Sequence, residues 1–346
     1  LAVVAACFFL SGTAGLIYQI AWMRNLAVIF GTAHIAVAAV LAAYMAGLSA
    51  GAALASRYAS SINRPVRAYA FLEFLIGFSA LLVPVMLIGA RSVFIFFFGG
   101  HDQPMPDYSL GQTGFFLIAT FVVLFIPTAA MGATLPLLAK YSIAENWQIG
   151  PRVSLLYGLN TMGAVAGTLL AGFVLLPFLG LLGSLIVGAL INLGVFLLVR
   201  GFVRETELPT EYQAKQELPK LGNRWVLPVI FVSGIVSFTL EVLWTRLLSH
   251  LFGGTVYAFA IMLACFLSGI ALGALAAGRI ARSQRDAPMQ LAFVLILIAG
   301  SSYLAYLSMA TVSFTGTTLL SKALFSFVIM FPASFFIGAT FPVAVR

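Results

Sequence analysis

The chain has 346 residues, of which 62% are hydrophobic and only 8% are charged. A soluble globular protein carries about one quarter charged residues, and a folded core could not hide this much apolar surface from water. The net charge of +8 does not indicate a nucleic-acid partner, because the basic residues lie between apolar runs and do not gather on one face. The sequence therefore predicts an integral membrane protein whose first partner is the lipid bilayer.

Continuous apolar runs follow one another along the whole chain. A membrane-spanning helix needs roughly 20 apolar residues, and the runs lack the alternation of a transmembrane β-strand. We expect an all-α polytopic fold with about ten transmembrane helices. In chain order these fall near residues 2–23, 33–56, 68–90, 113–139, 153–177, 180–200, 226–248, 255–278, 288–311 and 320–344.

Lysine and arginine are distributed unequally between alternate loops. If the first span begins in the cytoplasm, 14 of these residues fall on the inner side and 4 on the outer side. Cytoplasmic loops carry such an excess in multi-pass proteins. We therefore expect a bacterial inner (plasma) membrane protein with the N-terminus of its first span in the cytoplasm. The first segment is expected to be a true span and not a cleaved signal peptide.

The first and seventh runs match each other without gaps when the sequence is shifted by 222 residues, which places Trp22 on Trp244. Further along, the hexapeptide MGATLP at 131–136 returns as IGATFP at 337–342. With the orientation above, both copies run in the same direction. The sequence predicts two parallel repeats, as in the two halves of major facilitator transporters.

The predicted domain division follows from this duplication. Residues 1–200 form a first six-helix repeat, and 225–346 form a second repeat that is incomplete, with four helices. The segment between them, 201–224, mixes acidic and basic residues with two prolines. Such a composition is typical of a solvated linker, which we expect on the cytoplasmic side.

Small residues recur at four-residue spacing in the second and eighth runs, at Gly47 and Gly51 and again at Gly269 and Gly273. Residues four apart lie on one face of a helix, and small side chains let two helices approach closely. We interpret these glycines as packing ridges, with close approach to a ligand as the alternative. Asn160, near the start of the fifth run, is expected to bond to a neighbouring helix.

Ionisable residues inside a span are costly and are candidates for function. Glu241 lies within the seventh run, at the position that the shift matches to Gln19. It could bind a proton or a cationic substrate, since aromatic rings favour an ammonium group. The alternative is structural, with Glu241 paired to an arginine. The predicted binding set consists of Glu241, Gln19, Tyr18, Trp22 and Trp244.

Four further residues are candidates for ion pairs or gates. Glu73, near the inner end of the third run, is expected to form an ion pair with Arg67 at the surface or in the adjoining loop. Arg24 and Arg246 lie at outer ends of spans, where they either reach for lipid headgroups or form a gate salt bridge. Trp22 and Trp244 could equally serve as interface anchors.

No metal or cofactor is expected. The two cysteines, Cys7 and Cys265, lie inside apolar runs and suit buried packing. The three histidines show no metal-ligand spacing.

Several of these motifs resemble one family of multi-pass proteins. The stretch 11–19 (SGTAGLIYQ) with Trp22 and Arg24, the stretch 131–136, the stretch 157–164 (YGLNTMGA) and 175–177 (LLP) are similar to the fused major facilitator/spermidine synthases. The resemblance implies a membrane bundle followed by a cytosolic domain like spermidine synthase. The Gly-rich loop and acidic residues that aminopropyl transfer requires are not found in this sequence, so any such activity would belong to a C-terminal domain missing from it.

The sequence also departs from the major facilitator pattern, and it leaves two main hypotheses. Major facilitators commonly carry an aspartate in the loop after the second span, whereas the stretch 51–67 has arginines and no aspartate. This weakens the case for an ordinary alternating-access cycle. The first hypothesis is a transporter-like protein that moves or senses a small cationic metabolite such as a polyamine. The second is a membrane anchor or accessory subunit for a cytosolic spermidine synthase-like domain or a larger membrane complex.

Overall fold

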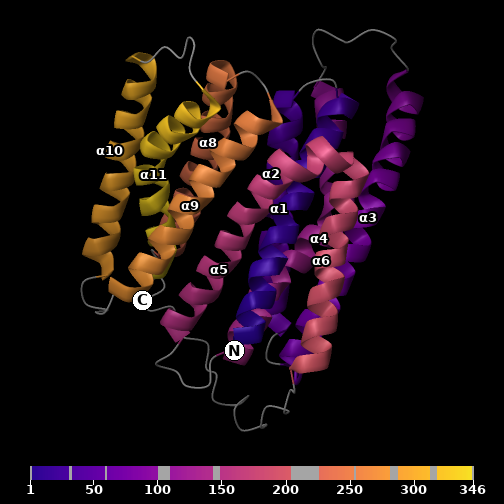
Figure 1. Ribbon diagram of the computed structural model, residues 1–346, viewed down its shortest axis with the longest axis horizontal. Coiled ribbons are helices and arrows are strands. Elements are labelled where there is room, and N and C mark those ends of the chain that lie inside the picture. Colours follow the sequence, from indigo (N-terminus) through magenta and orange to yellow (C-terminus); the bar gives the residue numbers. More distant parts are fainter. Residues whose placement is uncertain are drawn as a thin grey trace. The chain divides into compact units, whose positions relative to one another are not determined.

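The fold is seen in a computed structural model that describes residues 2–30, 33–58, 61–99, 110–142, 149–203, 226–252, 255–280, 287–311 and 318–344. Within these ranges the chain is helical and has no strand. The elements are α1 (Ala2–Phe30), α2 (Ala33–Tyr58), α3 (Pro65–Phe98), α4 (Leu110–Ser142), α5 (Ile149–Leu170), the π-helix η3 (Ala171–Leu175), α6 (Leu176–Phe202), α8 (Val226–Phe252), α9 (Val256–Ile280), α10 (Ala287–Thr311) and α11 (Leu319–Ala344) (Figure 1).

In the described part of the chain, nine helices are long and apolar enough to cross a membrane. The longest runs from Leu155 to Phe202, and Gly180 breaks its path with φ 66° and ψ −167°. A positive φ is a conformation that glycine adopts without steric cost. The all-helical, multi-pass class predicted from the sequence is confirmed, while the number of ten spans and their arrangement as repeats stay predictions.

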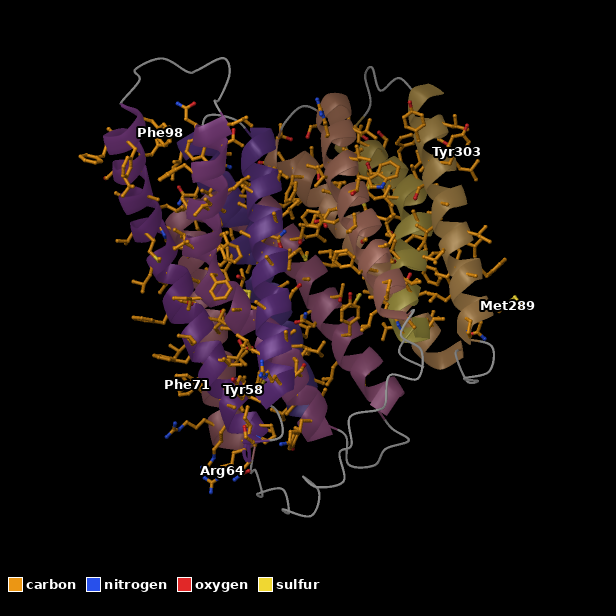
Figure 2. The ribbon with its side chains drawn as sticks, turned by 180° about the vertical axis from the view of Figure 1, so that it is seen from behind. Tyr58, Arg64, Phe71, Phe98, Met289 and Tyr303 are labelled. Carbon is orange, nitrogen blue, oxygen red and sulfur yellow. The ribbon has the colours of Figure 1, made fainter. Side chains whose placement is uncertain are left out.

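Large apolar side chains cover the outside of the helices. Phe71 on α3 is 60% exposed, and Met289 and Tyr303 on α10 are 77% and 63% exposed. Figure 2 shows these side chains extending away from the ribbon. Water would penalise so much apolar surface, whereas hydrocarbon accepts it without loss.

The helices group into two compact units. The amino-terminal unit contains residues 14–140 and 170–205, and the carboxy-terminal unit contains 1–13, 141–169 and 206–346. In this grouping the start of α1 and α5 up to Leu169 cluster with the later helices. The division at 201–224 stays a prediction. Most of the predicted linker lies outside the described residues.

Each unit contains a tightly packed pair of helices. In the amino-terminal unit, a methyl group added at Gly47 or Gly51 would collide with Thr128 or Ala129 of α4. In the carboxy-terminal unit, a methyl group at Gly269 or Gly273 would collide with Ser334 or Phe335 of α11. The glycines of α2 and α9 therefore lie where the backbones of two helices approach most closely.

Candidate intramembrane binding site

Glu73 lies in the first half of the long helix α3 and is fully buried, with 0% of its surface exposed. It shares one face of α3 with Ile76, Gly77 and Ala80, which are buried as well. The sequence led us to expect Glu73 at a surface or in a loop. The structure corrects this expectation, because the apolar face of α3 that packs against α6 carries Glu73 into the interior.

The carboxyl group of Glu73 is held by a side chain that the sequence analysis did not single out. Asn192 on α6 donates a hydrogen bond from Nδ2 to Oε2 of Glu73 at 2.5 Å. The hydroxyl of Tyr18 on α1 donates to Oδ1 of Asn192 at 2.7 Å. Three helices are thus joined by a buried hydrogen-bond chain that runs from Tyr18 through Asn192 to Glu73.

Two glycines make this approach of α1, α3 and α6 possible. A Cβ at Gly188 on α6 would meet the ring of Tyr18, and a Cβ at Gly77 on α3 would lie 3.2 Å from the Cβ of Asn192. Larger side chains at these places would push the helices apart. The small residues therefore set the distance at which the three polar side chains can bond.

Aromatic side chains continue the site along α1. The rings of Tyr18 and Trp22 are stacked, with centroids 5.5 Å apart and planes inclined by 11°. Both side chains are fully buried, and Gln19 between them is 3% exposed. The indole Nε1 of Trp22 has no hydrogen-bond partner among the described residues. Of the predicted binding set, Tyr18, Gln19 and Trp22 therefore lie together in the amino-terminal unit.

A hollow of about 630 Å³ opens between α3 and α6 near the site. Its lining includes Val66 and Ala70, which lie seven and three residues before Glu73 and so on the same face of α3. Arg67 and Arg200 also line this hollow, and both are exposed. The predicted gate residue Arg67 thus lines a hollow between α3 and α6 that lies before Glu73 along α3.

The second half of the predicted binding set lies in the other unit. Glu241 and Trp244 on α8 are 5% and 3% exposed. The hydroxyl of Thr245 donates to the backbone carbonyl of Glu241 at 2.8 Å. Arg246, a predicted ion-pair partner, is exposed and lies five residues after Glu241, which places the two on different sides of the helix.

The structure also gives the positions of the remaining candidate residues. Arg24 on α1 is exposed. Asn160 on α5 is close to Gly12, where an added Cβ would collide with the Asn160 carbonyl. Among the described residues no group of three metal-binding side chains occurs.

Comparison with known proteins gives one distant similarity. The chain resembles a polyamine aminopropyltransferase of Corynebacterium efficiens. The two are 27% identical over 194 residues, which cover 55% of this chain and 32% of that protein. The chain therefore spans about a third of the length of its curated relative. No protein-family model matches the sequence, and the fused facilitator and synthase arrangement stays a prediction.

Proposed function

We propose that this chain is the membrane part of a transporter-like protein that takes up a small cationic metabolite, with the carboxyl group of Glu73 as its cation-binding group. The observation that carries the proposal is the burial of Glu73 on a membrane-spanning helix, where Asn192 holds it in place. Acidic residues within membrane-spanning helices are rare and commonly mark the pathway of an ion or a substrate.

The surroundings of Glu73 suit an ammonium group. Asn192 and Tyr18 orient the polar side of the site. The stacked rings of Tyr18 and Trp22 offer aromatic faces to a cation. The similarity to a polyamine aminopropyltransferase supports a polyamine as the substrate class. Glu241, Gln19 and Trp244 remain proposed members of the binding set.

We further propose that the bundle arose by duplication into two parallel halves, as in major facilitators. The contacts of the packing glycines support this. Gly51 meets Ala129, and the residues matched to them, Gly273 and Phe335, meet in the same way. Gly132 meets Leu48, while its counterpart Gly338 meets Ile270. Equivalent residues thus make equivalent contacts within each unit.

A second candidate function is a membrane anchor for an aminopropyltransferase-like domain, or an accessory subunit of a larger complex. The relative named for that activity is about three times as long as the matched stretch, so this alternative places the chemistry outside the present residues. We also propose the inner membrane and a cytoplasmic start of α1, on the basis of the basic residues in alternate loops.

Uptake of labelled spermidine into vesicles containing the purified protein tests the transporter proposal. We expect Glu73→Gln to reduce uptake at least about tenfold, because removing a full negative charge costs more than 1.4 kcal/mol of cation binding. Glu73→Asp keeps the charge and should retain part of the uptake. Size-exclusion elution checks that each variant is folded.

Glu241→Gln is the matched comparison, since Glu241 is the other acidic residue predicted within a span. A loss of uptake in this variant alone would reject Glu73 as the binding group. Absence of both uptake and binding in the unaltered protein would reject transport and favour the anchor.

A further inference from the structure

The hollow between the start of α3 and the end of α6 is lined by two arginines. Arg67 lies in the first turn of α3, and Arg200 lies in the last turn of α6. Both side chains are exposed, and the other residues that line the hollow are apolar. The hollow therefore combines two positive charges with apolar walls, at one end of two helices that are long and apolar enough to cross a membrane.

Each helix contributes the same pair of side chains to this hollow. On α3, Phe71 follows Arg67 by four residues, and on α6, Phe196 precedes Arg200 by four residues. Residues four apart share one face of a helix and lie ~6 Å apart along its axis. Since both arginines are at helix ends, both phenylalanines lie about one turn nearer the middle of the membrane.

The guanidinium group of Arg200 is held over an aromatic ring. Its Cζ lies 5.9 Å from the centroid of the Phe196 ring, a distance at which a cation is attracted to the face of the ring. The Phe196 ring in turn contacts Phe74 on α3, with the two ring centroids 5.6 Å apart. This contact between the two helices holds the charge of Arg200 beside the hollow.

A phospholipid with a negatively charged headgroup matches this arrangement. Guanidinium groups bind phosphate through paired N–H donors. Phe71 is 60% exposed and extends away from α3 (Figure 2), so an acyl chain can lie against it in hydrocarbon. A free phosphate ion would bind the arginines and leave these apolar walls uncovered. Basic pockets between transmembrane helices are typical sites for anionic lipid headgroups.

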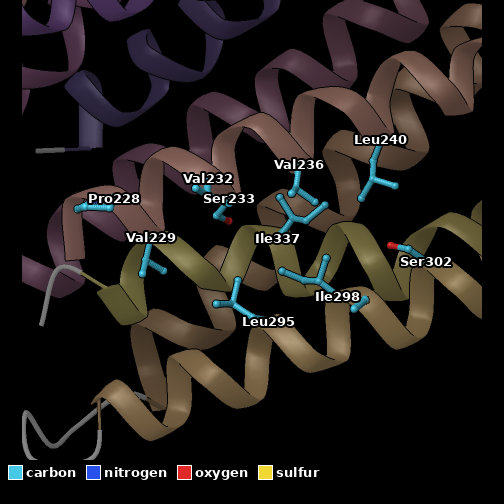
Figure 3. A pocket seen from close by; sticks show the side chains of 11 residues that line it. Pro228, Val229, Val232, Ser233, Val236, Leu240, Leu295, Ile298, Ser302 and Ile337 are labelled. Atoms are coloured by element: carbon cyan, nitrogen blue, oxygen red, sulfur yellow. The ribbon is translucent and has the colours of Figure 1, made fainter. Parts of the chain in front are cut away.

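The carboxy-terminal unit has a hollow of a different kind. It measures about 500 Å³ and lies between α8 and α10, with Ile337 of α11 beside it. Figure 3 shows that apolar side chains line most of it, and its polar residues are Ser233 and Ser302. None of the described residues that line it is ionisable. A lipid lying there would not be selected by the charge of its headgroup.

We propose that the hollow between α3 and α6 is a binding site for one anionic phospholipid, with its phosphate bound by Arg67 and Arg200 and an acyl chain against the phenylalanines beneath them. The bound lipid would join the ends of the same two helices that the hydrogen bond between Asn192 and Glu73 joins further along. This site is separate from the proposed transport and does not depend on it.

Binding of phosphatidylglycerol with a fluorescent acyl chain to the purified protein, in a neutral detergent, tests the site. We expect Arg67→Gln and Arg200→Gln each to weaken this binding about fivefold, and the two together about 25-fold, because each arginine loses its attraction to the anionic headgroup. Arg57→Gln is the matched control. Arg57 is exposed at the end of α2 and does not line the hollow, so this variant should bind the lipid as the unaltered protein does.

Two competitors identify what the site recognises. Phosphatidylcholine has the same phosphate neutralised by choline, and glycerol phosphate supplies the headgroup without acyl chains. We expect unlabelled phosphatidylglycerol to displace the fluorescent lipid better than either. Equal displacement by phosphatidylcholine would reject a site for anionic lipid, and equal displacement by glycerol phosphate would indicate a site for free anions instead.

The variants decide whether the arginines form the site. Unchanged binding in the double glutamine variant would reject the proposal. Arg67→Lys with Arg200→Lys keeps both charges and should bind the lipid more tightly than the double glutamine variant. Thermal unfolding in phosphatidylcholine checks that each variant is folded. No spermidine is present in these measurements, so a failure of the lipid site and a failure of the proposed function can be told apart.

Discussion

At the scale of single residues, Asn192 is the side chain on which the buried network depends. It is 1% exposed and bonds to both Glu73 and Tyr18. Asn192→Ala removes both bonds, and we expect it to lower the free energy of unfolding by about 1–2 kcal/mol. Thermal unfolding in detergent measures the effect. Leu193→Ala, a neighbour that is 40% exposed, should change stability less. Equal losses in the two variants would contradict the role given to Asn192.

The sequence predicted part of this network and missed the rest for a physical reason. Tyr18 and Glu73 stand out because they are polar residues in apolar runs. Asn192 is equally polar in such a run, and the general rule that polar side chains in spans bond across helices would have marked it. The packing of α3 against α6 is seen in the structure and cannot be read from a single sequence. Glu73 was therefore assigned to the nearby Arg67, and its hydrogen bond to Asn192, 119 residues further along, was not predicted.

At the scale of the helices, the packing glycines make a sharp prediction. Gly51→Ala and Gly273→Ala each place a methyl group against a backbone carbonyl of the facing helix. We expect each to lower the free energy of unfolding by about 1–3 kcal/mol, the usual result of overpacking. Gly89→Ala on α3 is the control, because no atom lies within 4 Å of its added Cβ. Alanine favours a helix over glycine, so this variant should be neutral or stabilised by up to about 1 kcal/mol.

Helix positions were predicted well and helix lengths less so. The third apolar run was expected at 68–90, whereas α3 extends from Pro65 to Phe98. At ~1.5 Å per residue a helix of 34 residues is longer than the hydrocarbon layer is thick. Hydropathy marks only the part that lies in hydrocarbon, and it does not detect a helix that continues past it.

At the scale of the whole chain, the charge pattern of the sequence and the contacts between helices indicate different boundaries between units. The linker at 201–224 is conspicuous because it is charged. Packing instead joins α5 to the later helices, since a Cβ at Gly158 would meet the side chain of Leu275 on α9. Gly163 and Gly167 of α5 bring it against Phe9 and Thr13 at the start of α1. These contacts depend on three-dimensional proximity, which a composition profile does not contain.

The proposed parallel duplication has a direct topological consequence. Ser61, in the turn between α2 and α3, is matched by Ser283 when the sequence is shifted by 222 residues. Parallel halves require the two positions to face the same side of the membrane. The excess of basic residues in these loops predicts that this side is the cytoplasm, because cytoplasmic loops of multi-pass proteins are enriched in lysine and arginine.

Cysteine labelling in membrane vesicles decides between parallel and inverted halves. Ser61→Cys and Ser283→Cys, each in a chain with Cys7→Ser and Cys265→Ser, should react with a membrane-impermeant maleimide in inside-out vesicles only. His101→Cys, in the loop that the sequence places outside, should react in right-side-out vesicles. If Ser61→Cys and Ser283→Cys were labelled from opposite sides, the halves would be inverted. The proposal of two major facilitator-like halves would then be rejected, because such halves are related by an axis along the membrane normal.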